Sequence, residues 1–153
     1  EDDDDDGDSY SDLGVPVLTD VRLGCGPLGG ILTALANATT EVTLVVAGDM
    51  PFLTVAFLRH LVQAGHNVDV AVPWTVDGYQ PLCAAYNRTC MSTIQRHLDV
   101  GLLKVNDLLL DVHVRKLNSD EIKPFNPDGT LFFNINTPHD YTRGLQIAEK
   151  HHR

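Results

Sequence analysis

Four polar side chains in this sequence could bind phosphates or a metal ion, and each stands where an apolar segment gives way to a turn. Asp20 precedes a glycine-rich loop, and Asp49 follows a long apolar run after a single glycine. Asn134 and Asn136 flank a single isoleucine. Ligands of open α/β sheets bind beyond the carboxyl ends of the strands. If these segments belong to one sheet, the four side chains gather at one edge and form a site.

Asp49 is the most informative of the four. It follows the continuous, β-branched run of residues 42–47, which is typical of a strand covered on both faces. A carboxylate at the end of such a strand is costly to bury without compensation. Two roles would provide it: capping the next helix, or ligating a hard cation that bridges phosphates. The sequence alone leaves both roles open.

The loop of residues 24–30 contains four glycines and one proline. Such a loop lets backbone N–H groups approach a ligand closely, and the N-terminus of a following helix favours negative charge. The loop lacks the Gly-Lys-Ser/Thr ending of a P-loop, and Pro27 and Leu28 spoil its likeness to a dinucleotide-binding loop. A phosphate or a base edge would suit it, and an ordinary tight turn is the alternative.

The two asparagines would point to the same side of an extended segment, where their amides could bind phosphate, ribose or a metal shell. The alternative is an ordinary strand-to-helix turn, in which Thr137 is the helix N-cap and Pro138 occupies the first helical position.

Hydrophobic periodicity indicates alternating strands and helices, which argues for an α/β fold of three layers around a mostly parallel sheet. The expected strands are 42–47, 68–72, 79–86, 112–117 and 131–135, and the expected helices are 28–38, 54–64, 89–100, 103–110 and 137 to the end.

Composition indicates one domain and excludes several classes. Seven acids fall within the first eight residues, so residues 9–153 carry only about three of the ten net negative charges. We expect residues 1–12 to be a disordered acidic leader, with a docking tail as the alternative. No basic stripe suggests nucleic-acid binding, and no apolar run could span a membrane. The odd number of cysteines favours reduced thiols in a cytoplasmic protein.

Together, four segments resemble the molybdenum cofactor guanylyltransferase (MobA) family. The matching segments are Asp20 with 26–31, then 45–53, 80–86 and 133–140. Their order and spacing agree over residues 15–145. The resemblance implies a Rossmann-like, nucleotide-diphospho-sugar-transferase fold. It also implies an enzyme, a nucleotidyltransferase that transfers GMP from Mg·GTP to the phosphate of molybdopterin and releases pyrophosphate.

The resemblance also implies roles for individual residues. Asp49 is expected to ligate Mg²⁺ and to be the catalytic residue. The GTP-binding residues would be Asp20, Gly26, Pro27 and Leu28, and those near molybdopterin would be Gln80, Pro81, Asn134 and Asn136. Proteins that deliver molybdopterin, and molybdoenzymes that accept the product, are the implied protein partners.

One family feature does not occur in the sequence. Family members begin with a strand, a glycine-rich loop and a lysine that wrap the triphosphate, whereas the segment before Asp20 is short and acidic. We therefore interpret 13–153 as the C-terminal portion of the domain, an N-terminally truncated version of the fold. We expect residues upstream of Glu1 to supply the loop. A molybdopterin cytidylyltransferase, a sugar-phosphate nucleotidyltransferase and a non-catalytic molybdopterin-binding module remain the alternatives.

Overall fold

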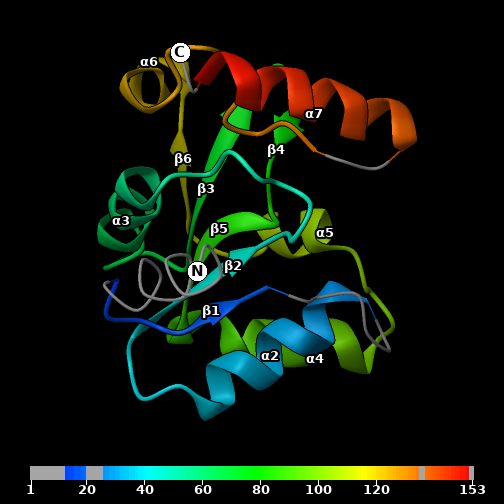
Figure 1. The fold of residues 1–153 in the computed structure, drawn as a ribbon. Coiled ribbons are helices and arrows are strands. Elements are labelled where there is room, and N and C mark those ends of the chain that lie inside the picture. The colour runs from blue at the N-terminus through cyan, green and yellow to red at the C-terminus, as the bar shows by residue number, and fades with distance from the viewer. Residues whose placement is uncertain (1–12, 20–25, 135–136, 152–153) are drawn as a thin grey trace.

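A computed structural model describes residues 13–19, 26–134 and 137–151, so the acidic leader lies outside the described part of the chain. The described residues form a six-stranded mixed sheet between helices (Figure 1). Its strands are β1 (Val17–Leu18), β2 (Val42–Val46), β3 (Val70–Thr75), β4 (Gly78–Tyr79), β5 (Cys83–Asn87) and β6 (Val114–Leu117).

The sheet is mixed, but four of its six strands (β1, β2, β3 and β6) run in the same direction, as the predicted mostly parallel sheet requires. β2 pairs in parallel with β1, and β3 pairs in parallel with β6. β5 lies between β2 and β3 and is antiparallel to both. Its direction follows from its short connection to β3, since a parallel neighbour would need a crossover of a dozen or more residues.

Helices cover both faces of the sheet, which gives the expected three layers. They are α2 (Pro27–Asn37), α3 (Val55–Ala64), α4 (Met91–Asp99), α5 (Val105–Leu109), α6 (Ser119–Ile122) and α7 (Pro138–His151), with 3₁₀ turns η1 (Arg88–Cys90) and η2 (Lys123–Phe125). One core cluster joins the sheet to α2, α4 and α5, and the other joins it to α3 and α6. α7 lies across the end of the molecule beside β3 and β4 (Figure 1).

The core explains why β2 is a continuous apolar run. All five of its residues are buried, and their side chains alternate between the two clusters. Val42, Leu44 and Val46 pack toward α3, whereas Val45 packs toward α2. Because both faces of β2 are covered, the strand has no polar face and its first exposed position comes only at its end.

Three sequence predictions about elements are wrong in detail. The strand expected at 68–72 continues through Pro73 to Thr75, and Pro73 pairs with Leu117 of β6 although proline has no N–H to donate. The strand expected at 79–86 is two strands, separated by a turn at 80–82 in which the Cys83 N–H donates to the Gln80 carbonyl at 3.0 Å.

The strand expected at 131–135 is absent from its described part, 131–134, which forms a turn. Its N–H groups bond locally: Leu131 donates to Asn126 Oδ1 at 2.9 Å, and Phe133 donates to the Thr130 carbonyl at 3.0 Å. Leu131 is nevertheless buried in the core, which shows that its apolar character serves packing rather than strand pairing.

Candidate functional site

Asp49 lies in the turn that ends β2, and one of its oxygens is buried without a partner. The residue as a whole is half-buried, but Oδ1 is inaccessible to solvent and accepts no hydrogen bond within the described residues. The helix-cap role that the sequence left open belongs to Thr54, whose side chain accepts a hydrogen bond from the Phe57 N–H at 3.2 Å. Since Asp49 does not cap α3, its unpaired oxygen calls for another partner.

A divalent cation would fit this oxygen. Within the described residues there is no group of three or more histidines, cysteines or acids that could hold a metal by themselves. Magnesium does not need such a cage, since it is commonly bound by one or two carboxylates together with substrate phosphates and water. The donor chemistry of Asp49 therefore suits a cation that arrives with a phosphate ligand.

Gly26, in the described part of the glycine loop, directly precedes α2. A Cβ added to Gly48 would lie 3.8 Å from the Thr19 carbonyl oxygen, so the ends of β1 and β2 are adjacent. Asp20 follows Thr19 but lies outside the described residues. Gly26 has φ 83°, a conformation that favours glycine, and Pro27 occupies the first turn of α2.

The N-terminus of α2 has no side-chain cap and no acid in its first turn. Its backbone N–H groups can therefore bind an anion. Leu28 differs from its neighbours, because its side chain is completely buried in the core. Only its backbone could contact a nucleotide.

The turn at 80–82 connects Asp49 to a large cleft. The Ala47 N–H, at the end of β2, donates to the Leu82 carbonyl at 2.7 Å. Gln80 Nε2 donates to Thr75 Oγ1 at 3.1 Å, which fixes the orientation of the amide and leaves Oε1 as its remaining acceptor. The Pro81 carbonyl accepts a 2.6 Å hydrogen bond from the Tyr86 hydroxyl. Pro81 therefore holds the turn in place rather than lining the cleft.

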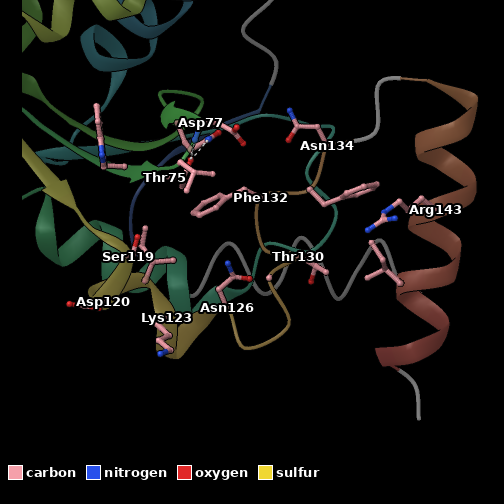
Figure 2. A pocket seen from close by; sticks show the side chains of 17 residues that line it. Thr75, Asp77, Ser119, Asp120, Lys123, Asn126, Thr130, Phe132, Asn134 and Arg143 are labelled. Carbon is pink, nitrogen blue, oxygen red and sulfur yellow. Dashed lines mark hydrogen bonds between the residues drawn. The ribbon is translucent and has the colours of Figure 1, made fainter.

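The cleft has a volume of about 920 Å³ and lies between β3, β4, α6, the loop 126–134 and α7. Figure 2 shows Phe132 and Asn134 facing it from the loop, and Arg143 reaching toward it from α7. Its lining residues are Trp74, Thr75, Val76, Asp77, Gln80, Ser119, Asp120, Ile122, Lys123, Asn126, Gly129, Thr130, Phe132, Phe133, Asn134, Arg143 and Ile147.

The predicted site residues thus fall into two neighbouring groups. Gln80 and Asn134 line the cleft, whereas Asp49, Gly26 and Pro27 lie outside its lining. A second contact joins the groups, because the ring centroids of Phe52 and Phe133 are 6.1 Å apart. Asn136, like Asp20, lies outside the described residues, so its predicted pairing with Asn134 stays a prediction.

The family follows from comparison with known sequences. The family model of the MobA-like NTP transferase domain matches residues 2–113. The chain belongs to this family. It is 36% identical over 137 residues to a probable molybdenum cofactor guanylyltransferase of Pelotomaculum thermopropionicum, a match that covers 90% of this chain and 67% of the relative. It is 34% identical over 113 residues to the molybdenum cofactor guanylyltransferase of Desulfosudis oleivorans, covering 73% and 56%.

Solved structures show the same MobA-like fold. The molybdopterin-guanine dinucleotide biosynthesis protein A of Archaeoglobus fulgidus matches with a TM-score of 0.72 at 30% identity, covering 80% of this chain and 63% of that protein. Rv0371c of Mycobacterium tuberculosis, in its complex with manganese, matches with a TM-score of 0.52 at 26% identity, covering 74% and 58%. The matches therefore span between 56% and 67% of the length of these relatives.

Burial makes the described cysteines of this MobA-like domain poorly suited to act as nucleophiles. Cys83 and Cys90 are free and buried, which agrees with the prediction of reduced thiols. Burial raises the pKa of the Cys90 thiol to about 12 and that of Cys83 further still. Neither is a thiolate near neutral pH. Cys25 lies outside the described residues.

Sequence reasoning did not find the aromatic and basic residues of the cleft. Trp74 and Thr75 end β3, and Arg143 comes from α7, far away in the sequence. Trp74 could have been suspected as the single tryptophan of the chain at a strand end. Arg143 gave no such signal, because one basic residue on a polar helix is ordinary.

No helix in the described ranges is long and apolar enough to cross a membrane.

Proposed function

We propose that the chain transfers GMP from GTP to the terminal phosphate of molybdopterin, with release of pyrophosphate. The observation that carries this proposal is the buried, unpaired Oδ1 of Asp49 at the end of β2. Membership of the MobA-like NTP transferase family supports the reaction type, and the names of the relatives support guanylyl transfer.

Asp49 would hold Mg²⁺ at this position. The manganese complex of Rv0371c supports a divalent cation in this fold, and manganese and magnesium both suit oxygen ligands. When bound, the cation supplies positive charge that neutralises the phosphates during transfer. Asp49 contributes a carboxylate of which one oxygen, Oδ1, is already buried before the ligand binds.

The other residues of the site would bind and orient the two substrates. The N–H groups that follow Gly26 and Pro27 at the start of α2 suit the nucleotide, with Asp20 as a further contact. Gln80 and Asn134 suit molybdopterin, with Asn136 beside them. The attacking phosphate is already anionic and needs no general base, so in-line positioning and charge neutralisation suffice.

Binding of Mg·GTP tests this proposal. At a ligand concentration 100 times its Kd, binding stabilises a protein by about 2.7 kcal/mol, which corresponds to a rise in melting temperature of about 5–10 °C for a domain of this size. We expect the wild type to show this shift and Asp49→Asn to lose it. Asp99→Asn is the matched control, since it makes the same change at an exposed acid on α4 and should keep the shift.

Substituting CTP for GTP separates the alternatives. A larger shift with Mg·CTP would favour a cytidylyltransferase over the proposed guanylyltransferase. A shift that survives in Asp49→Asn would remove Asp49 from the metal site. No shift with any nucleotide, together with binding of molybdopterin, would favour a non-catalytic module. The proposed protein partners, which deliver molybdopterin or accept the product, are tested separately by co-purification.

A further inference from the structure

Trp74 is the most exposed large aromatic side chain that lines the cleft. Its exposed fraction is 40%, although it stands at the end of a strand whose first four residues are buried. Tyr79 packs edge-on against its ring, with centroids 4.6 Å apart. Lys116 Nζ lies over the ring, 4.4 Å from the centroid. Both contacts hold the indole in one orientation.

The arrangement leaves part of the indole open to the cleft. Trp74 lines the cleft and Lys116 does not, so the ammonium contacts the ring from outside it. An aromatic ring that is fixed in place and exposed in a cavity can stack on a planar ligand without losing side-chain entropy on binding. The exposed part of the indole can therefore stack on a flat, aromatic ligand.

The formal charges of the residues that line the cleft indicate which part of a ligand would bind there. Its lining contains two acids, Asp77 and Asp120, and two bases, Lys123 and Arg143. Their formal charges cancel, so the cleft has no excess of positive charge for a triphosphate. The α2 N-terminus and Asp49, where a triphosphate and its cation would bind, lie outside the lining. A neutral heterocycle with hydrogen-bonding edges fits the cleft better.

Polar groups for such edges are present beside Trp74. Gln80, oriented by its hydrogen bond to Thr75, offers an acceptor, and Asn134 faces the cleft from the opposite loop (Figure 2). A pterin is a flat heterocycle with donors and acceptors around its edge. We propose that Trp74 stacks on the pterin ring of the acceptor substrate and so determines which acceptor the cleft takes. This inference rests on the proposed function, because that function supplies the pterin.

Calorimetric titration with the monophosphate of 6-hydroxymethylpterin tests the inference. Alanine substitution removes the stacking of a base on an aromatic side chain, which corresponds to a weakening of about 5- to 150-fold in Kd. We expect Trp74→Ala to weaken binding by that factor, and Trp74→Phe to stay within a few fold of wild type. Tyr141→Ala is the matched control, because Tyr141 is an exposed aromatic residue outside the cleft lining.

The single tryptophan gives a second readout, since pterin binding should quench the intrinsic fluorescence of the wild type. Undiminished pterin affinity in Trp74→Ala would overturn the inference. A loss of the Mg·GTP thermal shift in Trp74→Ala with unchanged pterin affinity would also overturn it, because the ring on Trp74 would then be the guanine. Binding of Mg·GTP without binding of the pterin would overturn the inference about Trp74 but not the proposed role of Asp49. Trp74-dependent binding of the pterin without binding of Mg·GTP would overturn the proposed function but not the inference.

Discussion

Replacing Asp49 by asparagine is expected to stabilise the protein in the absence of ligand. The substitution keeps the shape of the side chain and removes its charge. Because Oδ1 is buried and accepts no hydrogen bond within the described residues, the charged form is penalised in the ligand-free state. A residue kept for function rather than for stability behaves in this way, since its cost is recovered only when the ligand binds.

The magnitude follows from the burial of one oxygen. Leaving a buried acceptor unpaired costs about 1–3 kcal/mol, and more when the group is charged. Asparagine still buries one polar atom, so the substitution removes only the part of the cost that is due to the charge, and this part is small because Asp49 is only half-buried. We therefore expect the free energy of unfolding to rise by about 1 kcal/mol and the melting temperature by about 2–4 °C. Urea unfolding and calorimetry at pH 7, both without nucleotide or divalent cation, measure these quantities.

The control for this experiment is Asp99→Asn, which removes the same charge from an exposed position and should change stability by no more than about 0.5 kcal/mol. If Asp49→Asn instead lowers the free energy of unfolding by 1 kcal/mol or more, the carboxylate supports the fold. The reasoning that assigns Asp49 to a ligand would then be refuted.

Three further substitutions test the fold around the site. Gly65→Ala would place a Cβ 2.9 Å from the Ala85 Cβ, so urea unfolding should show a loss of about 1–3 kcal/mol. Thr54→Ala removes the N-cap of α3 and should cost about 1 kcal/mol by the same measurement. Hydrogen bonds from Arg115 hold the pKa of Glu121 below its ordinary value of 4.5, so this carboxylate stabilises the fold above pH 4.5 and loses that effect as the pH falls through its lowered pKa. The stability difference between wild type and Glu121→Gln should therefore be larger at pH 7 than at pH 3; equal differences would contradict the assignment.

The parts of the fold that local sequence determines could be predicted. The apolar run of β2 predicts a strand that is buried on both faces, and Asp49 is recognisable because it lies just beyond the end of that run. α2 and α3 begin within a residue or two of their predicted starts, because Pro27 and Thr54 are strong signals for a helix N-terminus. These features depend on residues that are close together in the chain.

Features that depend on distant contacts could not be predicted. Leu131 and its neighbours have the composition of a strand, but their N–H groups are satisfied by a local turn. The cleft brings Trp74 of β3 next to Arg143 of α7, and nothing in either local sequence indicates that meeting. The sequence also could not decide whether Asp49 caps a helix or ligates a metal ion. The structure excludes the cap role, because Thr54 is the N-cap of α3.

A crystal structure of the protein with Mg²⁺ and a non-hydrolysable GTP analogue would test the central claim most directly. The account predicts a metal ion about 2.1 Å from a carboxylate oxygen of Asp49, bridged to the phosphates of the nucleotide. A nucleotide bound with its metal on other residues, and with the Asp49 carboxylate still unpaired, would contradict it.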